Sequence, residues 1–434
     1  MRSLQANKEK NFASAAELQN SVQPAGLRSV QVAWLAAAVF IVSAGYGALL
    51  PVLPAWLAAL MPGASVSEVG RHVGFLSGIY AAGVLLGAPL WGVVSDRVGR
   101  RRILLIGLVG YVASLLLLLA PALANVGGIY ALRAATGFFV AAVVPVVAAL
   151  VAEHTPEPQR ARRFAWLGAM SLLGFLFGPA LSAVASSAAP WTGDAAVSPA
   201  QSAQSVLMLS ALLGGVIMLG LAATAPVSRG VQGLRQTPPQ NPAISHPAAL
   251  LWLSGTVMFV LAGFELGIVL LGQQAGQSSR QAAIMLAECS LVMLGVNALL
   301  FVSSLLERIR AWILIGTGLL LAVLGLTLLA VDRSDAWMYV GVGLTAGGTG
   351  LVLPVIAYLA AGAAPQRLGI VMGGLTAAAG LGQTLGAASG GWLFGLLAHR
   401  SFGWLALPLV GMLVLMLLLT SGPLKWQRRS PPSR

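Results

Sequence analysis

The chain has 434 residues, of which 58% are hydrophobic and only 9% are charged, and its mean hydropathy is +0.86. Soluble globular proteins have about 45–50% apolar and about 25% charged residues. This balance excludes an ordinary soluble protein and predicts a chain that crosses a membrane many times.

Long apolar runs recur along the whole chain. A bilayer core about 30 Å thick is crossed by about 20 helical residues at about 1.5 Å each. The runs are continuously apolar, whereas the strand of a membrane barrel alternates over about ten residues. We therefore expect an all-α membrane protein. Twelve transmembrane helices are predicted, at residues 32–60, 72–94, 103–123, 128–152, 164–187, 204–225, 247–271, 281–303, 312–331, 337–363, 368–397 and 403–422.

A break in the apolar pattern separates the predicted helices into two sets of six. Residues 226–246 contain closely spaced prolines, which a helix does not tolerate. We expect two pseudo-symmetric six-helix bundles joined by this linker. The predicted organisation is a cytoplasmic tail at 1–31, an amino-terminal bundle at 32–225, a cytoplasmic linker at 226–246, a carboxy-terminal bundle at 247–422 and a cytoplasmic tail at 423–434.

The formal net charge of +13 comes from 25 Lys and Arg against 12 Asp and Glu. With a cytoplasmic amino terminus, 20 of the 25 basic residues fall on the cytoplasmic side. Basic residues gather on that side of membrane proteins. The charge therefore predicts an orientation in the cell (inner) membrane with both termini in the cytoplasm, and it gives no reason to expect nucleic acid as a partner.

Cysteine and histidine provide no evidence for cross-links or metals. Cys289 is the one cysteine, so an intrachain disulfide is excluded. The four histidines are scattered at predicted helix ends without the spacing of metal ligands. We expect no metal site.

The segment between the second and third predicted helices concentrates unusual residues. Residues 92–102 contain four arginines, one aspartate and two glycines. A plain cytoplasmic loop requires arginines but neither the glycines nor the aspartate. Gly92 permits the close approach of a neighbouring helix, and Asp96 suits a helix amino terminus. We name this segment, with Gly92, Asp96, Arg97, Gly99, Arg100 and Arg101, the gate loop.

The two halves resemble each other at an offset of roughly 210 residues, as in transporters built from repeats. Several short patterns recur in the same order. The pairs include Pro145 with Pro354, Gly174-x3-Gly178 with Gly382-x3-Gly386, and Asp96-Arg97 with Glu307-Arg308.

The gate-loop pattern, the twelve helices and the repeat together resemble the major facilitator superfamily, in particular its twelve-helix drug:proton antiporters. The pattern is Gly, three residues, Asp-Arg, one residue, Gly and then basic residues, as in Gly92 to Arg101. The resemblance implies alternating access around a central cavity. It also implies that the gate loop contacts helix 11 when the cytoplasmic side is closed, and that the protein is not an enzyme.

Two further stretches resemble signatures of the same family. Gly174-x3-Gly178-Pro179 in helix 5 resembles an antiporter signature whose last glycine is replaced here by Ser182, so the resemblance favours export. Arg133 resembles an arginine near the start of helix 4 that is linked to proton transfer. Ordinary packing of small residues and an Arg133 that snorkels to the membrane surface are the structural alternatives.

Only two acids lie well inside predicted helices, Glu265 in helix 7 and Glu288 in helix 8. Removal of a carboxyl group from water favours its protonated form, and acids within a membrane are expensive and therefore usually functional. Helix 1 has the family's glycines and prolines at 42–54 but no acid. We therefore expect proton coupling in the second half, by Glu265 and Glu288, with Arg133. A structural, hydrogen-bonded glutamate is the alternative.

The remaining candidates are residues that line the cavity in the family arrangement. An apolar cavity with few polar groups suits amphipathic compounds. Packing is the alternative role for each of these side chains. They are Tyr46, Phe138, Trp166, Phe264, Asn297, Tyr358 and Gln383.

These observations predict a secondary active transporter that uses the proton gradient and no bound cofactor. The expected activity is export of small amphipathic organic molecules (drugs, siderophores or metabolites) by a monomer whose partners are its substrate and the lipid bilayer. Import or facilitated diffusion of a small metabolite is the alternative. A membrane-embedded enzyme would need clustered acids, which here are dispersed, and a receptor of transporter fold would bind without turnover.

Overall fold

The structure is a computed structural model that describes residues 27–120, 122–123, 125–155, 157–187, 198–225, 247–277, 279–303, 308–331, 335–363 and 368–421. Within these residues the chain is helical and contains no strand. The predicted linker, the carboxy-terminal tail, most of the amino-terminal tail and Glu307 lie outside them.

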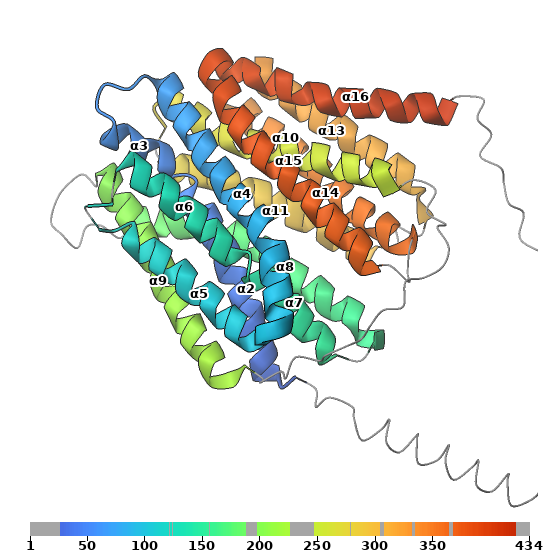
Figure 1. Cartoon of the computed structure of the whole chain (residues 1–434). Helices are drawn as coiled ribbons and strands as arrows, with labels where there is room; N and C mark the ends of the chain where they lie inside the picture. Colours follow the sequence, from blue (N-terminus) through green and yellow to red (C-terminus); the bar gives the residue numbers. More distant parts are fainter. Residues whose placement is uncertain are drawn as a thin grey trace, which may run out of the picture.

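All twelve predicted helices are present, two of them as a pair of shorter helices (Figure 1). Most begin within a few residues of the predicted start. The bounds are α2 (Ser29–Leu49) with α3 (Leu53–Leu60), α4 (Val66–Val98), α5 (Arg100–Leu117), α6 (Val126–Val140) with α7 (Val143–Glu153), α8 (Glu157–Ser187), α9 (Pro199–Thr224), α10 (Pro247–Gln274), α11 (Ser279–Val302), α13 (Ala311–Val331), α14 (Asp335–Ala363), α15 (Leu368–Leu397) with the short η3 (Ala398–Arg400), and α16 (Ser401–Ser421).

Polar side chains fix the start of several helices. The Ser65 hydroxyl accepts a hydrogen bond from the Glu68 amide at the start of α4. Asn125 does the same for Gly128 at the start of α6. These side chains satisfy amide groups that have no partner within the helix.

The two breaks were not predicted. The first helix is interrupted by a turn at residues 50–52 that contains Pro51, and the fourth by a turn at 141–142. Pro145 follows in the first turn of α7. Proline has no amide hydrogen and is tolerated where a helix starts, so each break places a proline where it costs little.

The two halves of the chain form two bundles that lie side by side (Figure 1). In the first half, α2 packs on α8, and in the second half α10 packs on α15. A Cβ on Gly178 would lie 2.6 Å from the Ala44 carbonyl oxygen of α2, and one on Gly386 would lie 2.0 Å from the Phe259 carbonyl oxygen of α10. The matched glycine pairs therefore have the same task in both halves, which supports the predicted repeat.

The bundles meet along α4 and α15 and along α8 and α11. We call the end of the protein that carries Arg97 and Arg102 the arginine end, and the other end the opposite end. Near the opposite end α4 and α15 touch backbone to backbone: a Cβ on Gly74 would lie 2.8 Å from the Gly391 Cα. This closed seam continues along α4 as far as Leu85, which contacts Gly380.

Among the residues that the structure describes, the contact between α4 and α15 ends before the arginine end. The α4 face that carries Gly74 and Leu85 continues at Pro89, Gly92 and Asp96, because residues three or four apart share a helix face. Pro89 and Asp96 are exposed, and no atom lies within 4 Å of a Cβ built on Gly92. The structure is thus closed at the opposite end and open along α4 at the arginine end.

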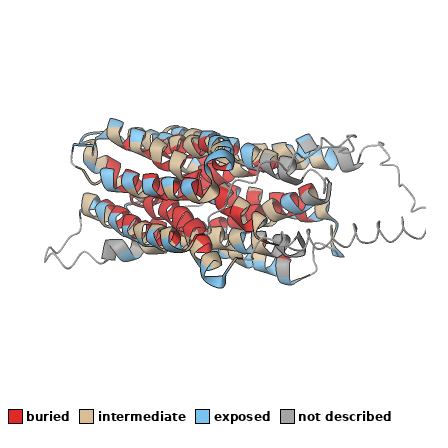
Figure 2. Ribbon diagram, turned by 60° about the horizontal axis from the view of Figure 1, so that its bottom comes forward, coloured by how far each residue is buried: buried red, intermediate tan, exposed pale blue. Residues whose placement is uncertain are grey.

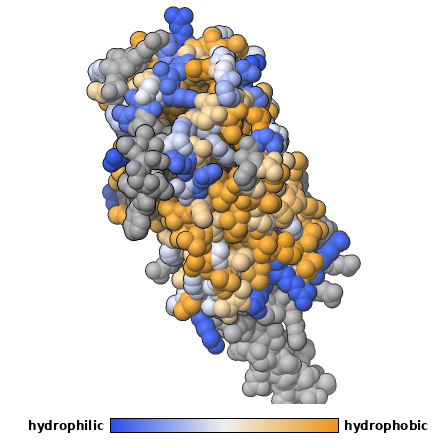
Figure 3. All heavy atoms as spheres, turned by 90° about the vertical axis from the view of Figure 1, so that its left-hand side faces the viewer, coloured by the Kyte–Doolittle hydropathy of each residue, from blue (hydrophilic) through white to orange (hydrophobic). Residues whose placement is uncertain are grey.

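The outer surface suits a bilayer. Nine apolar stretches in the described residues are long enough to cross a membrane, and one of them, Gly374–Leu418, covers most of α15 and of α16. The remaining two helices are α5, which begins with three arginines, and α8, whose apolar part is the shorter Trp166–Ser182. Buried residues concentrate between the helices (Figure 2), and hydrophobic side chains cover the middle of one outer face (Figure 3).

Candidate functional site

Arg133 is the buried cation of the amino-terminal bundle. It lies on α6 and is only 3% exposed, so it does not snorkel to the membrane surface. The two ion pairs among the described residues both involve Arg100, and the Arg133 Nε has no hydrogen-bond partner there. Its guanidinium instead lies 4.5 Å from the ring centroid of Tyr80 and 6.0 Å from that of Tyr46. Aromatic faces attract cations, so two tyrosine rings partly stabilise this charge.

Glycines bring Arg133 to Tyr80. A Cβ on Gly137 would lie 2.1 Å from the Tyr80 carbonyl oxygen, and one on Gly83 would lie 2.5 Å from the Ala134 carbonyl oxygen. Such distances are possible only without a side chain, so α4 and α6 approach as closely as membrane helices can. The guanidinium one helical turn before Gly137 therefore reaches the ring on α4.

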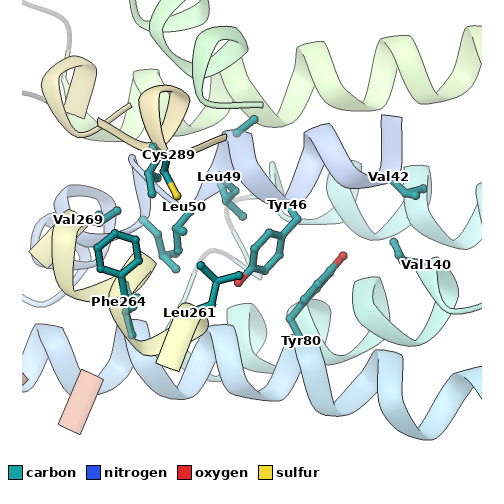
Figure 4. Packing of buried hydrophobic residues seen from close by; sticks show 14 of the residues in the cluster. Val42, Tyr46, Leu49, Leu50, Tyr80, Val140, Leu261, Phe264, Val269 and Cys289 are labelled. Atoms are coloured by element: carbon teal, nitrogen blue, oxygen red, sulfur yellow. The ribbon is translucent and has the colours of Figure 1, made fainter. Parts of the chain in front are cut away.

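Tyr46 extends from α2 across the interface between the bundles. Its ring lies 5.0 Å from the Tyr80 ring and 5.5 Å from the Phe175 ring, and its hydroxyl points toward α10 beside Leu261 (Figure 4). The hydroxyl is within hydrogen-bonding reach of the Gln383 side chain on α15. Tyr46 thus belongs to one bundle and makes a polar contact with the other.

Glu265 lies on α10 within electrostatic reach of Tyr46 and of Cys289 on α11. It is enclosed by protein but its side chain remains partly exposed. An acid so enclosed in a membrane protein is costly and usually functional, which marks Glu265 as the first candidate for a proton or a ligand.

Glu288 lies on α11, in the same bundle as Glu265. It shares Cys289 as a neighbour with Glu265, and its Oε1 lies 3.6 Å from a Cβ built on Gly343 of α14. Its Oε2 is buried and has no hydrogen-bond partner among the described residues. A buried polar atom without a partner is costly, which marks Glu288 as a second candidate for a proton or a ligand.

The gate loop forms a compact network within one bundle. Arg100 forms an ion pair with Asp96 and donates from its Nε to Glu153 at the end of α7, at 3.0 Å. Gly99 has φ of +106°, which explains the need for glycine between α4 and α5. Arg101 donates to the Ala222 carbonyl at the end of α9, whereas Arg97 is exposed.

A model of the Major Facilitator Superfamily matches residues 35–346 of the chain. The protein belongs to the major facilitator superfamily. It is therefore a multi-pass membrane protein and a secondary transporter rather than an enzyme, as the sequence predicted.

Curated relatives match over part of their length. Tetracycline resistance protein class B of Escherichia coli is 35% identical over 146 residues, which cover 34% of this chain and 35% of that protein. Quinolone resistance protein NorA of Staphylococcus aureus is 27% identical over 143 residues, which cover 33% of this chain and 35% of that protein. The aligned region thus spans about a third of each relative.

Solved structures match over nearly the whole chain. The human organic anion transporter MFSD10 has a TM-score of 0.66 and 20% identity, covering 89% of this chain and 99% of that one. The xylose transporter XylE of Escherichia coli has a TM-score of 0.69 and 14% identity, covering 91% and 98%. At these identities the likeness establishes the fold, which confirms the predicted two-bundle architecture of this major facilitator.

The structure does not test the gate-loop contact expected for this superfamily, because that contact belongs to the state closed on the cytoplasmic side. Gly92 was expected to permit close helix contact, but in this state it faces open space. Asp96 was expected near helix 11 when the cytoplasmic side is closed, and here it is paired with Arg100 instead. The reason is the separation of α4 from α15 at this end.

The glycines of helix 5 pack as the structural alternative predicted. A Cβ on Gly174 would lie 2.4 Å from the Phe40 carbonyl oxygen, and Pro179 lies beside Gly47. Ser43 and Ser171 add a hydrogen bond of 2.9 Å between α2 and α8. Their packing role is direct, whereas their link to export stays a prediction.

The structure brings together only some of the predicted cavity residues. Tyr46 and Gln383 join the cluster around Glu265. Phe264 is fully buried and lies 6.5 Å from Phe402 of α16, so its place in the cavity was wrong. Neighbouring residues of a helix point about 100° apart, so Phe264 and Glu265 face different sides.

The other candidates lie elsewhere. Phe138 stacks on Trp91 at 5.2 Å and accepts a hydrogen bond from its indole at the backbone carbonyl. Asn297 donates to the Met293 carbonyl of its own helix, at 2.7 Å. Trp166 and Tyr358 are exposed, and no described contact joins either to the Glu265 cluster.

Tyr80 and Cys289 are members of the cluster that the sequence did not reveal. A tyrosine or a cysteine in an apolar helix is unremarkable by itself, and only the packing of α4 on α6 and of α10 near α11 gives them neighbours. In the described part of the chain no group of three His, Cys, Asp or Glu is placed to hold a metal ion.

Proposed function

We propose that the protein exports small amphipathic organic molecules in exchange for protons. The observation that carries this proposal is the position of Glu265, which is deep in the protein, partly exposed and next to the interface between the bundles. An acid in a membrane usually marks an ion or substrate path. Glu265 would bind a proton in one state and release it in the other.

The orientation follows from charge. Basic residues of the arginine end would lie on the cytoplasmic side, so the structure would be open to the cytoplasm. The protein would act as a monomer in the cell (inner) membrane, with both termini in the cytoplasm and the proton gradient as its source of energy. Cargo would enter from the arginine end and reach the layer of Tyr46 and Glu265.

The relatives support an amphipathic cargo. The proteins that match over the aligned third are named for resistance to tetracycline and to quinolones. Leu261, one turn before Glu265 on α10, lies beside the Tyr46 ring (Figure 4), and apolar walls with few polar groups fit such molecules. Import or facilitated diffusion of a small metabolite is the competing function, because the fold is shared with sugar transporters.

Transport by purified protein in vesicles tests the proposal. Vesicles with an imposed pH gradient are mixed with tetracycline or ethidium, and uptake and proton flux are recorded together. We expect E265Q to lose proton-driven accumulation by about tenfold or more, since a glutamine cannot carry the proton. E68Q, at an acid in the first turn of α4, should transport as the wild type does.

Two results would overturn the proposal. Either E265Q retains the wild-type ratio of protons to cargo, or the wild type moves these probes only down their own gradient. The effect of E288Q sharpens the assignment: loss equal to that of E265Q would make Glu288 an equal partner, whereas partial loss would make it an accessory site.

A further inference from the structure

One side chain lies between the buried cation and the interfacial acid. The Arg133 guanidinium lies 6.0 Å from the Tyr46 ring centroid, and the hydroxyl of Tyr46 lies within hydrogen-bonding reach of Gln383 and within electrostatic range of Glu265. Tyr46 interacts electrostatically with both Arg133 and Glu265. The two charges belong to different bundles, so Tyr46 links them across the interface.

We propose that Tyr46 is a positioning residue that prevents the empty protein from carrying protons across the membrane without cargo. The proposal rests on the proposed role of Glu265 as the proton carrier. When Glu265 is ionised, the Tyr46 hydroxyl donates a hydrogen bond to its carboxylate, and the ring keeps its contact with Arg133. Hydrogen bonds to a charged group are about twice as strong as neutral ones, so ionised Glu265 holds α2 and α6 of one bundle to α10 of the other.

This link favours the state seen here, which is closed at the opposite end. An exchanger of cargo for protons must not change state while it carries neither cargo nor proton. If it did, it could pick up a proton on one side and release it on the other, and each cycle would move a proton without any cargo. A group that binds one state better shifts the equilibrium toward it by that difference in affinity. Protonation of Glu265, or arrival of cargo at its carboxylate, removes the link and allows the change of state.

Few other titratable or polar groups lie near Glu265 and could form this link in place of Tyr46. From α4 and α6 the titratable neighbours are Tyr80 and Arg133, both on the far side of Tyr46, and from α11 they are Cys289 and Glu288. On α15 the polar neighbour is Gln383, which does not titrate. The helices α3 and α16 carry no titratable residue, and Asp335, Tyr339 and Tyr358 of α14 are near the ends of that helix.

The experiment requires no knowledge of the cargo. Protein in vesicles is given a pH gradient without any substrate, and the internal pH is followed with a trapped dye. Y46F keeps the ring beside Arg133 and removes only the hydroxyl. We expect its cargo-independent proton flux to exceed that of the wild type by about tenfold, the factor expected when one hydrogen bond to a charged group is lost. Y339F, which removes the hydroxyl of a tyrosine near the start of α14 and outside this cluster, should match the wild type.

The double variant Y46F/E265Q decides whether the leak is carried by the proposed site. Its flux should return to the background of protein-free vesicles, since no carboxyl group is left to carry the proton. Q383L should leak in the same direction as Y46F but less, because it removes only the second partner of the hydroxyl. A pH profile of the leak that follows the ionisation of Glu265 would further separate positioning from a loss of structure.

The outcomes distinguish this inference from the proposed function. If E265Q abolishes coupled transport but Y46F leaks no more than the wild type, the inference about Tyr46 is overturned and the function stands. A leak that persists in Y46F/E265Q also overturns it, because the protons then take another path. If E265Q leaves coupling unchanged, the proposed function fails first.

Discussion

The two ends of the interface between α4 and α15 differ in the residues that form them: small residues at one end and charged residues at the other. At the opposite end the contact consists of small residues, with Gly74 against Gly391 and Gly78 against Ala388, and backbones touch directly. At the arginine end α4 carries Asp96 and Arg97, both exposed, and makes no such contact with the described residues. Helices that meet at glycines can pack closely without any charged contact, whereas a charged helix end packs against its neighbour only when oppositely charged groups or a helix terminus face it.

This difference suggests how one protein is stable in two states. Contacts without side chains gain dispersion energy from close packing and lose it at once when the helices separate. Ion pairs and helix-terminus contacts can instead exchange partners. In the state seen here Arg100 forms ion pairs with Asp96 and Glu153 within one bundle. These charged groups could exchange partners and form contacts with the other bundle when the arginine end closes.

The largest effect is expected where the seam is tightest. A Cβ on Gly391 would lie 2.6 Å from the Gly74 Cα, so G391V must push α4 and α15 apart at the opposite end. We expect transport to fall by about tenfold or more, because one state is strongly disfavoured. Spin labels at Arg71→Cys and Arg280→Cys, in a C289S background, should move further apart.

A matched change supplies the control for the seam. Gly411 on α16 has no atom within 4 Å of a built Cβ, so G411V adds the same atoms without a clash. Equal loss of transport in G391V and G411V would show that the added bulk, and not the contact between the bundles, is responsible.

The next effect is expected at the junction of the gate loop. Gly99 has φ of +106° and ψ of 136°, a region that residues with a side chain rarely adopt. G99A should lower the free energy of unfolding by about 1–3 kcal/mol, measured by thermal unfolding in detergent. G92A, in open space, should change it by less than about 1 kcal/mol. If both variants unfold like the wild type, the strained turn is not part of the folded loop.

Much of this architecture could be predicted because membrane helices must be long and apolar, and charges inside them are conspicuous. Arg133 and Glu265 were found for that reason. Tyr80 was missed because a tyrosine does not stand out among apolar residues, and its value comes only from the packing of α4 on α6. Phe264 was misplaced because it is adjacent to Glu265 in sequence, although helical geometry turns the two side chains to different faces.

The breaks at 50–52 and 141–142 show a second limit. Prolines occur near both, but proline is tolerated within membrane helices when neighbours satisfy the freed carbonyl groups. Pro89 and Pro179 indeed lie within the unbroken helices α4 and α8. Composition alone therefore cannot separate a bend from a break, which depends on what packs beside the freed carbonyl.

The smallest effect on stability, and the sharpest test of the charged end, is expected from D96N. The Asp96 side chain is 62% exposed in its pair with Arg100, and exposed ion pairs contribute about 0–1 kcal/mol. Unfolding in detergent should therefore change little. If Asp96 acts instead in the state closed at the arginine end, D96N should still slow transport severalfold, while E68Q does not. Unchanged transport would show that Asp96 has no role beyond its ion pair with Arg100, and that the arginines alone make the contacts that close this end.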